Sequence, residues 1–193
     1  MFNKMMGRTR YVVCRIMLHL SGSDVAPILG VLNSSAREAI DTEGDMEVLG
    51  EELVTICETL LQYDEYWTSA ANEGDVFWSE GEAGDYVQEL FTDSAQRYLS
   101  EAPGYNSDLD ESFSIPVTGN VVVMITVAYV GEVAQLEDDL SNIAALKEAL
   151  KALINLHYKQ KIRAVQVHFS PAQLGDELTS DQLLQYYTEL IPL

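Results

Sequence analysis

Val121–Val130 reads VVVMITVAYV and is the longest uncharged apolar run in the chain. Most of its residues are β-branched, and only Thr126 and Tyr129 interrupt the run with polar groups. This composition predicts a central β-strand that is covered on both faces. The run is too short to cross a bilayer as a helix, which needs about 20 residues.

The residues after this strand predict a helix and then a second strand. Gly131 ends the run, Ser141 is a candidate N-cap, and apolar residues then recur at helical spacing up to His157. Ile162–Phe169 alternates as a strand does. The order is that of a β-α-β unit, and its crossover would be right-handed if the two strands were parallel.

Tyr11–Leu20 predicts a third strand, because every second residue from Val12 is apolar. A short edge strand over Phe113–Val117 would make the sheet three- or four-stranded. About five helices are expected, over Val25–Ile40, Met46–Leu61, Asp85–Ser100, Ser141–Tyr158 and the stretch that follows the capping box of Thr179 and Gln182. We expect the Ser141–Tyr158 helix on one face and at least one helix of the Val25–Leu61 hairpin on the other. The fold class predicted is α+β, with α/β as the alternative.

The length and composition bound the number of domains. The chain has 193 residues, of which 47% are hydrophobic, which is enough for a proper core. We expect a single domain over residues 1–193, with residues 1–10 flexible.

The formal charge of −20 is unevenly distributed. Between Glu38 and Glu111 lie 21 of the 31 acidic residues, and Arg97 is the only base there. Nucleic-acid binding is disfavoured, because it depends on Lys and Arg that neutralise phosphates. A solvated, solubilising surface is the preferred interpretation, and a dedicated electropositive partner is the alternative.

The two cysteines, Cys14 and Cys57, lie in apolar runs without C-x-x-C spacing and are expected to be buried thiols in a reducing compartment. Tyr11–Leu20 is interrupted by Arg15 and His19, so it does not resemble a signal peptide. We therefore expect a cytoplasmic protein without a transmembrane segment. Peripheral membrane association and the oligomeric state are left open.

The segment between Gln62 and Gly84 has no sustained period and contains several acids and aromatics. We expect a long loop, a feature that is often functional. Its aromatics form a candidate interaction patch: Tyr63, Tyr66, Trp67, Phe77 and Trp78. The preferred interpretation, however, is that the two tryptophans fold back into a small satellite core, and the exposed patch is the alternative.

No catalytic, metal or cofactor motif is found. Asp41–Glu52 has acids at several EF-hand positions, but Met46 stands where the loop needs glycine. His19 and His168 lack ligand-type neighbours at metal-binding spacing and are expected to be structural. A basic cluster at the end of the helix is the best anion-site candidate: His157, Lys159, Lys161 and Arg163. No cofactor is expected.

The C-terminal third resembles the family of cyanobacterial and chloroplast proteins called domain of unknown function 1517. Ala164–Pro171 (AVQVHFSP) and Leu178–Leu193 (LTSDQLLQYYTELIPL) occupy the places of that family's AVEVLWTPQ-like strand and L-T-x-D-E-L-L ending. The chain departs from the pattern at Gln166, His168 and Phe169, and at Tyr187-Thr188. The resemblance implies a photosynthetic organism and a role in acclimation of photosynthesis, and it supplies no catalytic residues.

Two functional hypotheses follow. The first is a non-catalytic regulatory or interaction protein that binds a protein partner through the acidic surface and the aromatic segment. The second is a small-molecule-binding domain or small enzyme with a pocket at the C-terminal ends of parallel strands. The polar groups of that pocket would be Glu132, His168, Ser170 and Tyr187.

Overall fold

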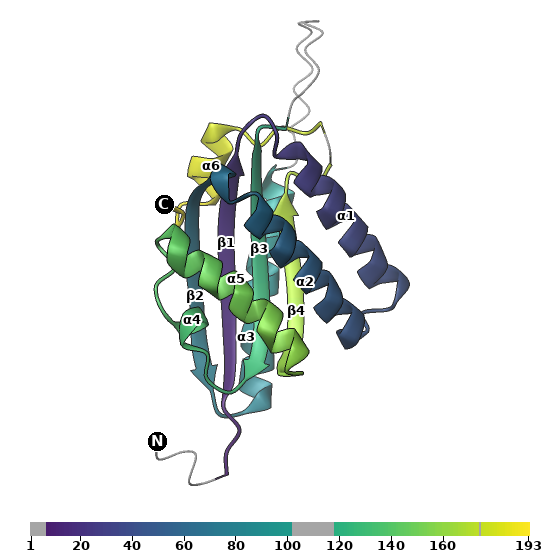
Figure 1. Ribbon diagram of the computed structural model, residues 1–193, viewed down its shortest axis with the longest axis vertical. Coiled ribbons are helices and arrows are strands. Elements are labelled where there is room, and N and C mark those ends of the chain that lie inside the picture. Colours follow the sequence, from purple (N-terminus) through teal and green to yellow (C-terminus); the bar gives the residue numbers. More distant parts are fainter. Residues whose placement is uncertain (1–6, 102–117, 174) are drawn as a thin grey trace, which may run out of the picture.

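The computed structural model of the chain describes residues 7–101, 118–173 and 175–193, and this part has a mixed α+β fold (Figure 1). The described residues form a five-stranded antiparallel sheet that is covered by helices on both faces, and six α-helices, so the expected three or four strands and about five helices are too few. The elements are β1 (Tyr11–Ser21), α1 (Ala26–Asp41), α2 (Met46–Gln62), a 3-10 turn η2 (Asp64–Tyr66), β2 (Trp67–Phe77), α3 (Glu80–Glu101), β3 (Asn120–Val130), α4 (Ala134–Glu137), α5 (Ile143–Tyr158), β4 (Ile162–Ser170), α6 (Ser180–Tyr186) and β5 (Ile191–Pro192).

The strand order is β4-β3-β1-β2-β5, so the three predicted strands are direct neighbours. Ile125 of β3 lies opposite Ile16 of β1 on one side and Val167 of β4 on the other. All residues from Val121 to Tyr129 are buried. The prediction of a central strand covered on both faces is therefore confirmed.

The predicted parallel arrangement of the β-α-β unit is wrong, because β3 and β4 pair antiparallel. After β3 the chain crosses to the β2 edge of the sheet, where α4 lies and where the Leu140 N–H donates to Asn72 Oδ1 of β2 at 3.1 Å (Figure 1). α5 then runs diagonally back across the sheet and returns the chain to the end at which β3 stopped (Figure 1). There the Val130 N–H donates to the Lys161 carbonyl at 3.0 Å, so β4 starts beside the end of β3.

α1, α2 and α5 all cover the same face of the sheet, and α3 and α6 cover the other (Figure 1). The main core joins Leu29 of α1, Leu53 of α2 and Leu150 of α5 to the even-numbered residues of β1. On the opposite face Val87 and Leu90 of α3 pack on Val13 and Ala128. The expectation that the α1–α2 hairpin lies opposite α5 is therefore wrong. A strand that is apolar on both faces does not determine which helix covers which face.

The acidic aromatic segment is not a long loop, because its middle forms β2 along the full length of β1. Gly74 allows β2 to lie close against β1. A Cβ at Gly74 would lie 2.5 Å from the Val13 carbonyl oxygen, so only glycine allows the two strands to approach this closely. The other strand expected at the edge, Phe113–Val117, lies outside the described residues.

The helix ends largely follow the predicted capping signals. Thr179 and Gln182 form the predicted capping box at the start of α6. The N-cap of α5 is Asn142 rather than Ser141, and its side chain accepts from the Ala145 N–H at 2.9 Å. α3 begins at Glu80, five residues before the predicted Asp85.

Candidate functional site

β2 is an edge strand for most of its length. β5 pairs only with Ser69 and Ala70, and the remaining stretch, Ala71–Phe77, has no strand neighbour on its outer side within the described residues. Unpaired edge groups of this kind are ready to pair with another chain.

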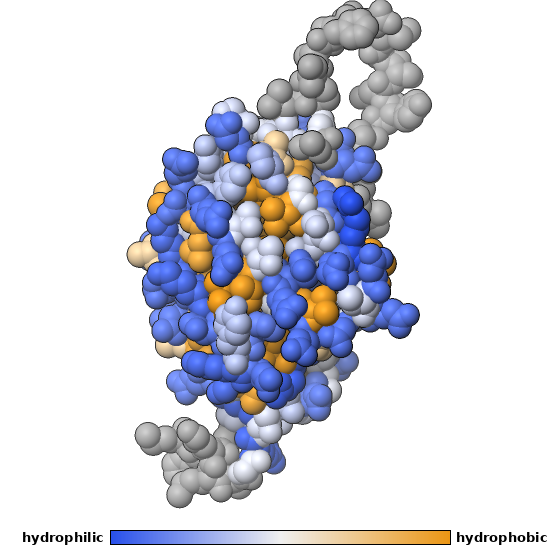
Figure 2. All heavy atoms as spheres, turned by 45° about the vertical axis from the view of Figure 1, so that its right-hand side comes forward, coloured by the Kyte–Doolittle hydropathy of each residue, from blue (hydrophilic) through white to orange (hydrophobic). Residues whose placement is uncertain are grey.

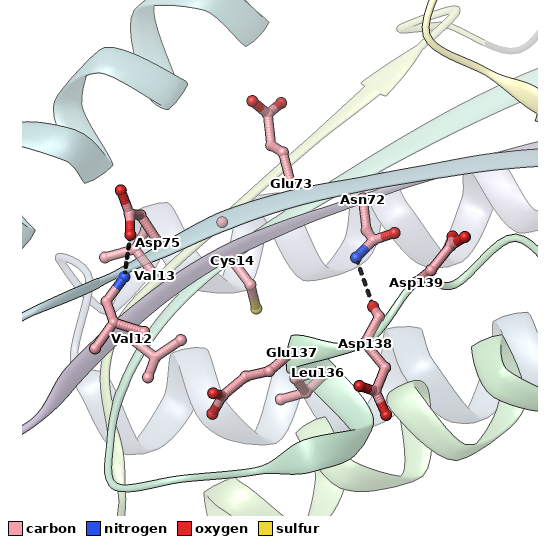
Figure 3. A pocket seen from close by; sticks show the side chains of 12 residues that line it. Val12, Val13, Cys14, Asn72, Glu73, Asp75, Leu136, Glu137, Asp138 and Asp139 are labelled. Carbon is pink, nitrogen blue, oxygen red and sulfur yellow. Dashed lines mark hydrogen bonds between the residues drawn. The ribbon is translucent and has the colours of Figure 1, made fainter.

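A cleft of about 420 Å³ lies beside this free edge, between β2 and the segment that contains α4 (Figure 3). This volume falls within the range of small-ligand pockets, about 300–1,000 Å³. Val12, Val13 and Cys14 of β1 also contribute to the cleft. The remaining lining residues come from β2 and the α4 segment: Asn72, Glu73, Gly74, Asp75, Val76, Leu136, Glu137, Asp138 and Asp139.

Asn72 fixes the wall of the cleft. Its Nδ2 donates to the Asp138 carbonyl at 3.0 Å, and its Oδ1 accepts from the Leu140 N–H at 3.1 Å. The side-chain amide therefore binds one main-chain carbonyl and one main-chain N–H of the segment after α4. The cleft is consequently held at a fixed width next to the free edge.

The carboxylate of Glu137 is bound by other groups of the protein. Arg10 donates to its Oε1 at 2.9 Å and forms a salt bridge to Oε2 at 2.5 Å, while the Val133 N–H donates at 3.0 Å. Burial acts to raise the Glu137 pKa, but the hydrogen bonds from Arg10 and Val133 outweigh it and hold the pKa below its ordinary value. Glu137 is therefore ionised and closes one end of the cleft.

Three other carboxylates around the cleft have no cation. Asp75 accepts its neighbour's N–H, from Val76, at 2.7 Å, and Asp139 accepts from Ser141 N–H at 3.0 Å. Neither these two nor Asp138 forms a salt bridge within the described part of the chain. The cleft therefore has a negative potential that attracts cations.

The thiol of Cys14 lies between the sheet and α4 (Figure 3). Burial raises the Cys14 pKa to about 12, so the thiolate is not populated near neutral pH. Among the residues that the structure describes, no group of three His, Cys, Asp or Glu side chains could hold a metal ion. The cleft offers cation binding and backbone pairing, and its residues show no nucleophile–base pair.

The opposite face of the sheet carries a transverse row of polar side chains. Register places Glu73, Arg15, Thr126 and Gln166 side by side across four strands. Arg15 is only 2% exposed and donates to Glu73, Asp93, Ser94 and the Leu90 carbonyl. These contacts fix α3 on the sheet.

A second arginine extends this network towards the C-terminus. Arg97 donates to Asp93 at 3.0 Å, to the Tyr186 carbonyl at 2.9 Å and to Glu189. The Asp93 pKa is held below its ordinary value, because hydrogen bonds from Arg97 and Arg15 outweigh the effect of burial. Both arginines line a depression of about 320 Å³, but each already binds carboxylates of the protein.

His19 lies on the same face in a chain of hydrogen bonds. Asn120 Nδ2 donates to the Leu178 carbonyl at 3.0 Å, so Asn120 Oδ1 is the atom that accepts from His19 Nε2 at 3.0 Å. His19 Nδ1 is then free to accept from the Ser69 hydroxyl at 3.2 Å. This arrangement suits a neutral imidazole, in agreement with the structural role predicted for His19.

The free energy of unfolding should rise as the pH is raised through about 6.5, the ordinary pKa of histidine. Burial lowers the pKa of His19 below 6.5, against the Asn120 hydrogen bond, and burial together with Arg15 lowers the pKa of His168. As the pH falls below 6.5, the unfolded chain therefore binds protons that the folded chain excludes. Urea unfolding across this range measures the slope, which should flatten when both histidines are replaced by Gln. A stability that is constant or decreases with rising pH would contradict this assignment.

The predicted aromatic patch is divided between the two ends of β2. Trp67 is buried and its indole N–H donates to the Leu60 carbonyl at 3.1 Å, while Tyr63 and Tyr66 pack beside it with ring centroids 5.9 Å apart. Phe77 and Trp78 lie at the other end of an 11-residue strand, ~30 Å away. These five aromatics therefore do not form one surface.

The predicted basic cluster is also separated. His157 packs over Gly50 of α2, where a Cβ would collide with its ring. Arg163 donates to the carbonyls of Gln160 and Ile162 at 3.1 and 2.9 Å. Only Lys159 and Lys161 remain together, in a shallow pocket of about 180 Å³ that also contains acidic residues.

The residues of the alternative pocket lie in different places. Glu132 lines the pocket with Lys159 and Lys161, whereas Ser170 lies opposite Val122 at the other end of the sheet. Tyr187 packs on Val122 there, and His168 stacks edge-on against Phe91. The antiparallel pairing of β3 and β4 is the reason, because it places Gly131 and Ser170 at opposite ends of the sheet.

The residues that do form the cleft were not singled out from the sequence. Asp75 belongs to a segment that was expected to be a loop, and Asp138 and Asp139 lie between a predicted strand and a predicted helix, where no role was assigned to them. The one available signal was the pair of acidic stretches around Gly74 and after Leu136. The pairing of β2 with β1 is what brings them together.

The fold and this cleft define an antiparallel α+β protein with an acidic hollow at an open sheet edge. The family model described as "Protein of unknown function (DUF1517)" matches residues 10–193, and the chain belongs to this family, as the resemblance in its C-terminal third predicted. No curated protein and no solved structure matches the chain. No helix of the described residues has the length and apolar character needed to cross a membrane.

Proposed function

We propose that this protein is a non-catalytic interaction module that binds an extended, cationic segment of a partner protein along the free edge of β2. The observation that supports this most directly is the unpaired stretch Ala71–Phe77 next to a cleft with three unpaired aspartates. Main-chain hydrogen bonds to a strand edge provide affinity, and the side chains on either face provide specificity.

The cleft determines the chemistry of the partner segment. Side chains on one face of an added strand would meet Asp138 and Asp139 across the cleft, and those on the other face would lie beside Glu73 and Asp75 (Figure 3). Lys and Arg suit both faces. Seven residues of strand offer ~23 Å of edge. The family resemblance leads us to propose photosynthetic cells, and acclimation of photosynthesis, as the setting in which to seek the partner.

The test is affinity purification from cells that produce the protein, using two variants of equal charge. In the first, Asp75, Asp138 and Asp139 become Asn, and in the second the exposed α2 residues Glu47, Glu51 and Glu58 become Gln. The wild type and the α2 variant should retain the partner, the cleft variant should lose it, and added salt should weaken it. Hydrogen exchange of the complex should show protection over residues 71–77.

Equal recovery of the partner by both variants would contradict a role for the cleft, because a non-specific charge effect does not depend on position. Failure to recover any partner above background, from soluble and membrane fractions alike, would contradict the interaction function itself.

A further inference from the structure

The opposite edge of the sheet is also open, and its chemistry is different. β4 pairs with β3 alone among the described strands. The stretch from Ala164 to Ser170 contains no charged residue. Natural proteins usually protect edge strands with charges, prolines or bulges. An uncharged edge of this length is therefore open to pairing with another chain.

A hollow of about 90 Å³ opens beside this edge, between β4 and the two helices α1 and α2. Its lining is apolar apart from Ser35 and Glu52, and its other residues are Leu32, Ala36, Ala39, Leu49, Leu53, Ile56, Val165, Val167 and Phe169. An engineered cavity of about 150 Å³ accepts benzene, so this hollow suits a smaller aliphatic group. A side chain the size of valine or threonine would fit.

Ser35 points to an occupant of this hollow. It is only 4% exposed, and its hydroxyl has no hydrogen-bond partner. A buried polar group without a partner costs free energy, so native structures rarely retain one without a reason. A polar group of a bound segment would supply the missing hydrogen bond.

Polar side chains on the other face of β4 also lack hydrogen-bond partners. Gln166 Oε1 and His168 Nδ1 are inaccessible to water and form no hydrogen bond, and neither does the Ser170 hydroxyl. Gln166 Oε1 is an acceptor only, and a neutral imidazole offers a second acceptor. A strand added beside β4 would place every second side chain next to this face, and a rotation of Gln166 or His168 would bring their acceptors to hydrogen-bond donors on that strand.

The charge around the hollow favours a cationic partner. The α1–α2 hairpin, Ala26–Gln62, carries eight acids and one base, Arg37. None of these acids forms a salt bridge within the described residues. Figure 2, which turns this side forward, shows apolar patches separated by strongly hydrophilic surface. A second copy of the chain, with its formal charge of −20, is electrostatically disfavoured.

We propose that the outer edge of β4 is a second docking site, which binds an extended protein segment that alternates aliphatic residues with lysine or threonine. The aliphatic side chains lie along Val165, Val167 and Phe169, and a valine or threonine fills the hollow beside Ser35, where the threonine hydroxyl would supply the missing hydrogen bond. The alternate residues lie beside Gln166 and His168, whose side chains turn outwards to accept hydrogen bonds from them. With an occupied edge at each end of the sheet, the domain joins two segments.

The probe is a fluorescent nine-residue peptide, equal in length to β4, in which valine alternates with lysine or threonine. A peptide of the same composition with its valines in one block is the control. Anisotropy should show tighter binding of the alternating peptide. Ala39→Leu, which fills the hollow from α1, should weaken that binding by roughly tenfold or more. Ser34→Leu adds an apolar side chain to the exposed face of the same helix and should leave binding unchanged.

Hydrogen exchange gives a second readout, which does not depend on a substitution in the hollow. The alternating peptide should protect residues 162–170, and neutralising Asp75, Asp138 and Asp139 should not abolish this protection. Equal binding of the two peptides, unchanged binding by Ala39→Leu, or protection confined to residues 71–77 would overturn the proposal. Protection confined to residues 71–77 would still be compatible with a role for the β2 cleft. The experiment can therefore contradict the β4 site without contradicting the β2 site.

Discussion

Ile125→Asp protein should fail to fold, whereas Ile40→Asp protein should fold and melt close to the wild type. Ile125 is 2% exposed and lies on β3 between β1 and β4. An unpaired carboxylate in such a core costs several kcal/mol, against a typical total stability of about 5–15 kcal/mol. Val123→Asp should behave in the same way, because Val123 is 1% exposed on the same face.

Ile40 provides the matched control, since the chemical change is identical but the residue is 75% exposed at the end of α1. Its replacement should change the free energy of unfolding by less than ~1 kcal/mol. Circular dichroism and urea unfolding of the three variants measure the difference. Wild-type spectra and melting temperatures for Ile125→Asp and Val123→Asp would show that the central placement of β3 is wrong.

The second large effect concerns Arg15. Replacing Glu73 and Asp93 together by Ala should destabilise the protein more than Arg15→Met does. The double variant leaves the Arg15 guanidinium, which is 3% exposed, without a salt-bridge partner, and loss of a partner from a buried pair costs ~3–5 kcal/mol. It also removes Asp93 from Arg97, which retains Glu189. Arg15→Met removes the buried charge and leaves two carboxylates that are 39% and 43% exposed, which water can solvate.

Urea unfolding at neutral pH gives both free energies, and Glu148→Ala is the reference. Glu148 pairs with Lys151 on the surface, where both side chains are more than half exposed, so its loss should cost less than ~0.5 kcal/mol. If Arg15→Met lowered the free energy of unfolding more than the double variant, the carboxylates rather than the arginine would be the charges that are destabilised by loss of their partner.

The acidic cleft shows why a site can be invisible in a sequence. Asp75 and Asp138 are separated by more than sixty residues, and each lies in a stretch that water could solvate equally well. Their proximity depends on two features of the fold. Gly74 allows β2 to lie close against β1, and Asn72 binds the segment after α4. Neither contact leaves a periodic signal.

The sequence by itself determined the apolar strands β1, β3 and β4, the helices α1, α2 and α5, and the capping box of α6. It also identified the family. These features depend on local composition, hydrophobic period or short motifs, and each is specified within a few neighbouring residues. β2 was missed because its residues Ala70–Asp75 have weak strand propensity and lie in place only through pairing with β1.

Only the tertiary structure decided the direction of β4, the face on which each helix lies, and the separation of the predicted sites. A helical connection of this length fits a parallel or an antiparallel neighbour, and two-sided apolar strands accept a helix on either face. The choice was made by long-range contacts such as Leu140 to Asn72 and Val130 to Lys161. Because such contacts join residues that are distant in sequence, the pattern of apolar and polar residues does not record them.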